Sequence, residues 1–207
     1  MIISDQHRFL FVHVQKTGGS SIDRAVSSAV PDVRRIGSLD RHATIGQILR
    51  AEPELRGYWT VGFVRNPWER MLSWHRMVER FVEGAEAGRP NHTRQLERND
   101  FLATVAREFP DFESFVLRGP DRFGRLRTPQ VGYLTSRTRR ADFVGRQESL
   151  DADLRAVFAR LGLPAPEVPE LNVDRERPDY HDVYTPAMRR RVAELFERDL
   201  NAFGYEF

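Results

Sequence analysis

Two short apolar stretches dominate the first half of the chain, and each is followed by a turn and a helical pattern. Residues 8–14 and 58–64 are rich in β-branched and aromatic residues and show no polar alternation, which is typical of buried strands in a parallel sheet. Apolar residues then recur at i, i+3 and i+4 spacing within residues 22–29 and 68–82, which predicts two amphipathic helices.

The second half of the chain shows further helical patterns around one polar segment. Residues 101–117, 150–161 and 186–196 carry apolar residues at helical spacing. Residues 83–100 are polar and contain two Gly and one Pro, which predicts a loop or mobile insertion. We therefore expect a single domain over residues 1–207. Its fold class is expected to be α/β, with three layers in which a mainly parallel sheet is flanked by helices on both faces.

The composition excludes several classes of protein. The 207 residues are 40% hydrophobic, which is enough to build a core. The absence of Cys excludes disulfides, Cys-based zinc sites and thiol nucleophiles. The chain has no apolar stretch long enough to cross a membrane and no visible signal peptide, so we expect a cytoplasmic protein. A net charge of +2 and the lack of an RNA-recognition motif argue against a nucleic-acid partner.

Lys16 is the only Lys in a chain whose other cationic side chains are all Arg. It lies in a turn between the first predicted strand and helix, where backbone N–H groups and the positive helix end favour a phosphate or sulfate. The glycines would allow close approach of the backbone, and the hydroxyls would add donors. A tight turn with a capping Ser is the alternative. Because Lys precedes the Gly pair, the segment is not a Walker A loop. The residues expected to form the anion site are Lys16, Thr17, Gly18, Gly19, Ser20 and Ser21.

A second motif follows the second predicted strand. Asn66 is a predicted N-cap and Pro67 a predicted first helical residue. Arg65 lies at the strand end, and Ser73 lies about two turns into the helix. These two side chains could bind a second phosphate. The alternative pairs Arg65 with a carboxylate and satisfies Ser73 within its own helix.

Taken together, the two motifs, K-T-G-G-S-S and V-R-N-P-W-E-R-M-L-S, resemble the superfamily of sulfotransferases that use 3′-phosphoadenosine 5′-phosphosulfate (PAPS). The chain looks most similar to the branch of carbohydrate sulfotransferases and their bacterial relatives. Residues 142–150 look like that family's later strand and following helix, and residues 171–205 like its terminal segment. The resemblance implies a P-loop-like first unit.

The resemblance also implies the ligands and their sites. PAPS would be the donor and adenosine 3′,5′-bisphosphate the released product, with no metal. Lys16 would stabilise the leaving oxygen, and Arg65 and Ser73 would hold the 3′-phosphate. Arg175 and Arg177, in a loop that covers the nucleotide in this family, are further candidates for that contact. The acceptor would be a hydroxyl of a carbohydrate, lipid or small molecule, with residues 83–130 as an insertion or lid on its side.

An acceptor hydroxyl also needs a general base. His42 is the leading candidate, because it lies between the two motifs and the family often has a His at the matching place. His13 is expected to be a packed strand residue, and His75 to lie in the core or near the nucleotide. Glu148 and Asp40 are weaker candidates for the base. The alternatives to a sulfotransferase are a P-loop-type kinase and a non-catalytic module that binds nucleotide or sulfated glycan.

Overall fold

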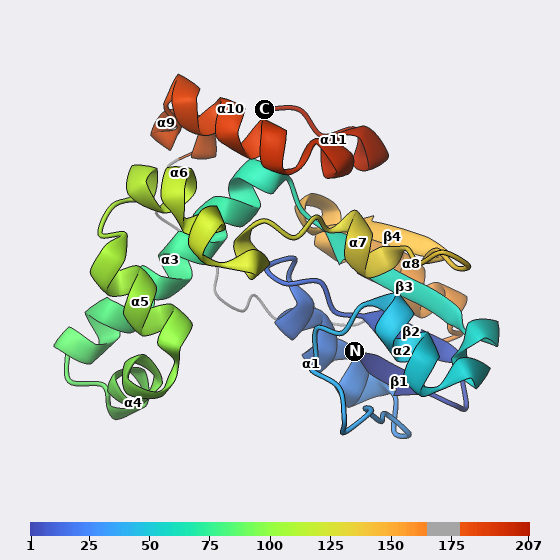
Figure 1. Ribbon diagram of the computed structural model, residues 1–207. Coiled ribbons are helices and arrows are strands. Elements are labelled where there is room, and N and C mark those ends of the chain that lie inside the picture. Colours follow the sequence, from blue (N-terminus) through green and yellow to red (C-terminus); the bar gives the residue numbers. More distant parts are fainter. Residues whose placement is uncertain (165–178) are drawn as a thin grey trace. The chain divides into compact units, whose positions relative to one another are not determined.

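The computed structural model describes residues 1–164 and 179–207 (Figure 1). The chain forms two compact units. The first contains Met1–Arg65 and the segment that begins at Gln130. The second contains Asn66–Pro129 and the C-terminal segment that ends at Phe207. Each unit has its own hydrophobic core, so each is described separately.

A four-stranded sheet forms the centre of the first unit. Its order is β1 (Ile2–Ser4), β2 (Phe9–Val12), β3 (Trp59–Val64) and β4 (Phe143–Arg146). β1 runs antiparallel to β2, whereas β2, β3 and β4 are mutually parallel. The prediction of a mainly parallel sheet is confirmed.

Helices cover both faces of this sheet. Phe11 and Phe63 lie on one face and pack with residues of α1 (Gly19–Ala29) and α8 (Leu150–Arg160). On the other face, Leu134 of α7 (Val131–Leu134) lies against Gly62, where an added Cβ would come within 2.2 Å of the leucine Cδ2. A strand without a side chain at this position lets the helix approach closely. The first unit also contains α2 (Ile45–Ala51), which packs beside α7, and two 3₁₀ helices, η1 (Pro53–Gly57) and η3 (Gln147–Ser149).

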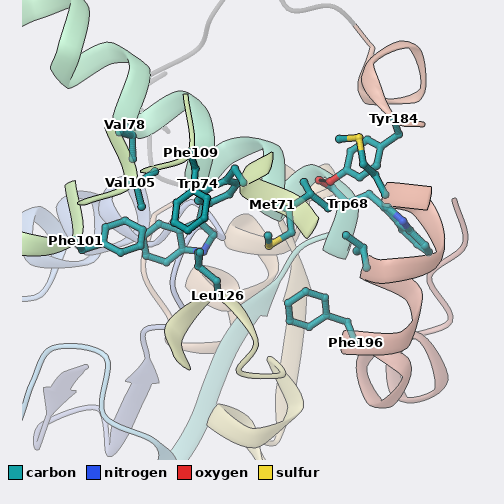
Figure 2. Close-up of a cluster of buried hydrophobic side chains, with 14 of the residues drawn as sticks. Trp68, Met71, Trp74, Val78, Phe101, Val105, Phe109, Leu126, Tyr184 and Phe196 are labelled. Carbon is teal, nitrogen blue, oxygen red and sulfur yellow. Dashed lines mark hydrogen bonds between the residues drawn. The ribbon is translucent and has the colours of Figure 1, made fainter. Parts of the chain in front are cut away.

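The second unit is helical in the residues that the structure describes. Its core gathers around one face of α3 (Pro67–Glu86), where Trp74 meets Phe101 edge-on at 5.3 Å between ring centroids (Figure 2). The helical spacing of the apolar residues in α3 is thus confirmed. The remaining helices are α4 (Pro90–Arg98), α5 (Asp100–Glu108), α6 (Phe112–Arg122), η2 (Gly124–Leu126), α9 (Tyr180–Val183), α10 (Pro186–Leu195) and α11 (Glu197–Phe203).

The prediction of a loop over residues 83–100 is wrong. α3 continues to Glu86, and α4 occupies most of the remainder. α4 could not be recognised from the sequence, because none of its residues is buried and the helix carries no apolar stripe. Gly84 does not break α3 but lets α4 approach, since an added Cβ would lie 1.5 Å from Nδ1 of His92. The role of residues 83–130 as a lid stays a prediction.

The predicted N-cap at Asn66 is confirmed, and two further helix starts differ in how they are capped. Asn66 accepts a hydrogen bond from the Trp68 amide, and Thr185 accepts one from the Met188 amide. Ser149 stands at the N-cap position of α8, but its hydroxyl donates to Asp153 and makes no cap bond. Across residues 1–164 and 179–207, no helix is both long and apolar enough to cross a membrane. The cytoplasmic location stays a prediction.

Candidate active site

The loop between β2 and α1 has two left-handed residues on either side of a buried one. Lys16 has a φ of 69° and Gly18 a φ of 78°. Thr17 between them is fully buried, and its hydroxyl donates to the Val14 carbonyl at 3.0 Å. A left-handed conformation costs a side-chain-bearing residue roughly 1–2 kcal/mol, so Lys16 is held in place against its own preference.

The start of α1 is capped by backbone alone. Gly18 occupies the N-cap without a side-chain bond, and its carbonyl accepts from the Ser21 and Ile22 amides. The first amides of a helix have no partner within it and carry partial positive charge. The Thr17 hydroxyl was expected to be an anion donor, but its proton is already used within the loop. The predicted place of Thr17 in the anion site stays a prediction. Ser20 is exposed and Ser21 is buried.

Gly19 leaves room for a neighbouring side chain, and its predicted place in the anion site stays a prediction. A Cβ added here would lie 2.0 Å from Nε2 of His13 and 2.2 Å from its Cδ2. The space left by the missing side chain is therefore filled by the His13 ring. Gly19 therefore permits close packing of a histidine onto the first turn of α1.

His13 is buried, with 4% of its surface exposed. Burial, followed by the nearby His42 and Arg41, lowers the pKa of His13 to about 2. Arg41 Nη2 lies 3.2 Å from His13 Nδ1. The expectation that His13 is packed agrees with this burial. Its backbone carbonyl is also bonded, because it accepts a hydrogen bond from His42 Nδ1.

His42 is fixed by two hydrogen bonds. Its Nδ1 donates to the His13 carbonyl at 2.9 Å, because a carbonyl oxygen can only accept. Its amide donates to Asp40 Oδ1 at 2.7 Å. The two imidazole rings meet edge-on with centroids 4.5 Å apart. A neutral His42 therefore carries its proton on Nδ1 and leaves Nε2 able to accept one.

Burial lowers the pKa of His42, and the Arg41 guanidinium lowers it further. The hydrogen bond to the His13 carbonyl acts in the opposite direction, since it favours the protonated ring. The net shift is downward, which keeps the ring neutral at ordinary pH. A neutral imidazole with a free Nε2 has the form that a general base needs.

Arg65 is buried at the end of β3. Its amide donates to Gln130 Oε1 at 2.9 Å, and its carbonyl accepts from Gln130 Nε2 at 2.8 Å. Gln130 is fully buried. Its side-chain amide makes the pair of hydrogen bonds with the Arg65 backbone that a neighbouring strand would otherwise make. These two hydrogen bonds could not be predicted from the sequence, because they join positions 65 residues apart in the chain.

Ser73 lies half-buried on α3 in the second unit. Arg65 belongs to the first unit. Their joint contact with one phosphate stays a prediction. Arg175 and Arg177 lie outside the described residues, so their predicted role is likewise open to test.

The other candidate bases have different surroundings. Asp40 supports the turn that carries His42, and Glu148 is exposed on η3. His75 is buried within the second unit against Phe112 and Phe115, with its Nδ1 3.4 Å from Glu79. His75 is thus a core residue.

Arg41 and Gln130 are the site-forming residues that the sequence did not reveal. Arg41 is adjacent to His42, but its contact with His13 spans 28 positions. Nothing in the local pattern marks such a contact. Within residues 1–164 and 179–207, no group of three or more His, Asp or Glu side chains is arranged to hold a metal ion.

Comparison with known protein families identifies the family of this chain. The sequence profile of the sulfotransferase family matches residues 1–206. The chain belongs to the sulfotransferase family. A carbohydrate sulfotransferase 14 from Danio rerio is 26% identical to it over 179 residues, which cover 79% of this chain and 48% of the relative. This sulfotransferase-family chain thus spans about half the length of the curated relative it matches. No solved structure matches it.

Proposed function

We propose that this chain transfers a sulfuryl group from PAPS to a hydroxyl of a small-molecule or glycan acceptor. The observation that carries the proposal is the β2–α1 loop of a sulfotransferase-family chain, where the lone Lys lies two residues before the N-cap of α1. The neutral His13 packs onto the first turn of that helix, and His42 lies against His13. The name of the zebrafish relative supports a carbohydrate as the first acceptor to try.

The residues of the loop suit an anionic donor. Lys16 supplies a compact cation, and the first amides of α1 supply neutral donors at the positive end of a helix. When bound, PAPS would supply an activated sulfuryl group. The same strand–loop–helix arrangement supports the P-loop-like character proposed for the first unit, with Lys placed before the Gly pair.

Each residue has a distinct proposed task in the transfer. In PAPS, one oxygen bridges the 5′-phosphorus and the sulfur, and the bond from this oxygen to sulfur breaks during transfer. Lys16 and the α1 amides would stabilise the negative charge that develops on that oxygen. His42 Nε2 takes the proton of the acceptor hydroxyl while its oxygen forms the new bond to sulfur. The products are a sulfate ester, adenosine 3′,5′-bisphosphate and a protonated His42 that returns its proton to water.

Arg65 and Ser73 are proposed to hold the 3′-phosphate of the nucleotide. Arg65 is well suited because Gln130 fixes its backbone from both sides. Arg175 and Arg177 are proposed as additional contacts to that phosphate. These four residues would give the chain its preference for a 3′-phosphorylated nucleotide over ordinary ADP.

Calorimetric titration with adenosine 3′,5′-bisphosphate tests the proposal, with ADP as the competing nucleotide. We expect selective binding, which Lys16→Ala and Arg65→Ala each weaken by about tenfold or more, since each removes a charge-assisted contact. Arg155→Ala is the matched control, because the partner of Arg155 among the described residues is Asp151, on the exposed side of α8.

Two results would contradict the proposal. Equal or tighter binding of ADP would favour a kinase. Tight binding of the bisphosphate without turnover of PAPS, over a panel of carbohydrate and small-molecule acceptors, would favour a non-catalytic binding module.

A further inference from the structure

His13 has no task in the transfer as described so far, although it lies directly on the first turn of α1. Its ring is 4% exposed, and the Nε2–Cδ2 edge occupies the space beside Gly19. A purely apolar ring such as Phe would fill this space without bringing a polar atom into it. Burying an imidazole costs free energy unless its nitrogen atoms find partners.

The contact with Arg41 fixes the position of the His13 proton. An arginine guanidinium has donors and no acceptor, so at 3.2 Å it must donate to Nδ1. Nδ1 therefore has no proton, and the neutral ring carries its hydrogen on Nε2. This N–H lies at Gly19, and no hydrogen-bond partner for it is found among residues 1–164 and 179–207.

The ring is also held in one state. Its pKa of about 2 keeps it neutral throughout the ordinary pH range. The His13 carbonyl is already engaged by His42, so the backbone at this position cannot turn without moving the proposed base. The N–H of a buried ring, with its tautomer fixed, thus lies beside the first residue of α1, at a helix start that favours anions.

We propose that His13 is a binding residue for the donor nucleotide, whose Nε2–H donates to the anionic group at the 5′ end, held at the start of α1. This inference rests on the proposed function and deepens it. The ligand class is a nucleotide that carries a 5′-phosphate or phosphosulfate. The site would then use one histidine as a neutral donor and its neighbour as a base.

Two ligands separate this role from simple packing. Adenosine 3′,5′-bisphosphate carries the 5′-phosphate, and adenosine 3′-monophosphate lacks it. His13→Phe keeps a ring but loses the donor, while His13→Gln places an amide N–H near the original Nε2. Both variants keep the main-chain carbonyl that orients His42.

We expect His13→Phe to weaken binding of the bisphosphate about ten- to hundredfold, which is the effect of one hydrogen bond to a charged group. His13→Gln should recover most of this loss. Neither variant should change the affinity for the monophosphate by more than about twofold. Wild-type affinity of His13→Phe for the bisphosphate, or an equal loss for both ligands, overturns the proposal.

A measurement on the wild-type chain guards against variants that do not fold. The Nε2–H resonance of His13 should shift and exchange more slowly with solvent when the bisphosphate is added, and should not respond to the monophosphate. An unchanged resonance at saturating bisphosphate overturns the role of His13 and leaves the proposed function standing. A wild-type chain that binds no bisphosphate overturns both.

Discussion

Burial controls the chemistry of the two neighbouring histidines. For both His13 and His42 it is the largest influence on the pKa, ahead of the charge of Arg41. Removing a ring from water disfavours its charged form, so both rings stay neutral in the folded chain. The same burial links their protonation to the stability of the fold.

Acid should destabilise the folded chain through His13. Its pKa is about 6.5 when unfolded and about 2 when folded, so below pH 6.5 the unfolded state binds a proton that the folded state does not. The resulting stability is fully present above pH 6.5 and is lost as the pH falls. Urea unfolding between pH 6.5 and 4.5 should show His13→Phe losing about 1.4 kcal/mol per pH unit less than wild type. An identical slope in the two chains would contradict this expectation.

The charge of Arg41 should help to set the pKa of His42, the proposed base. Because the guanidinium lowers the pKa of His42, Arg41→Gln should raise that pKa, while Arg41→Lys should leave it nearly unchanged. The neighbouring charges of Asp40 and the Met1 ammonium are the same in both variants. NMR titration of the His42 ring measures the shift directly and needs no acceptor. A pKa that responds equally to both substitutions would argue against a charge effect.

Single residues were predicted from the sequence where rarity or local spacing marked them. Lys16 stood out because it is the only Lys, and Gly18 because a turn between strand and helix needs one. The partners of His13 could not be predicted, because Arg41 and Gly19 reach it through the folded chain and not through a pattern. Arg175 and Arg177 lie outside the described residues, and their contact with the 3′-phosphate stays a prediction.

At the scale of elements, the spacing of apolar residues predicted the strands and helices that pack into a core. β2, β3 and α3 bury continuous or helically spaced apolar residues, and all three form where expected. α4 was missed because it buries none of its residues, and hence its sequence could not be distinguished from a polar loop. Amphipathic pattern therefore located the elements that build a core and overlooked one that lies on its outside.

Asn66 should contribute more stability than an ordinary helix cap. Its oxygen accepts from the Trp68 amide, and its Nδ2 donates to the Tyr180 hydroxyl and the Glu206 carbonyl. Removal of a cap alone costs about 1 kcal/mol. Asn66→Ala should therefore lower the free energy of unfolding by roughly 2–3 kcal/mol, once the lost side-chain bonds are added.

Asn99→Ala is the matched control for this cap. Asn99 caps α5 by accepting from the Leu102 amide. We expect it to cost about 1 kcal/mol. Equal losses for the two variants in urea unfolding would show that the contacts of Asn66 with the C-terminal segment add nothing.

At the scale of the whole molecule, the chain leaves the first unit after Arg65 and returns to it at Gln130. These two residues are hydrogen-bonded to each other, so the segment 66–129 begins and ends at one point of the first unit. Both hydrogen bonds of this closure are buried, and both join the Gln130 side chain to the Arg65 backbone. Gln130 therefore holds the backbone at the end of β3, where the chain leaves the first unit.

Gln130→Ala should destabilise the chain by about 2–4 kcal/mol, because it leaves a buried amide and a buried carbonyl of Arg65 without their bonds. Gln95→Ala, at an exposed position of α4, should change stability by less than about 0.5 kcal/mol. The comparison is made by urea unfolding of the full chain. A loss no greater than that of the control would mean that Gln130 does not hold the closure.

The packing of His13 onto Gly19 also constrains how this chain can evolve. A methyl group at position 19 and an imidazole at position 13 cannot occupy the same space. Relatives that acquire Ala, Ser or Thr at the first residue of this helix must therefore carry a smaller residue six positions earlier, and those that keep the histidine must keep the glycine. The two positions are expected to covary, and a library randomised at both should return compatible pairs rather than independent preferences.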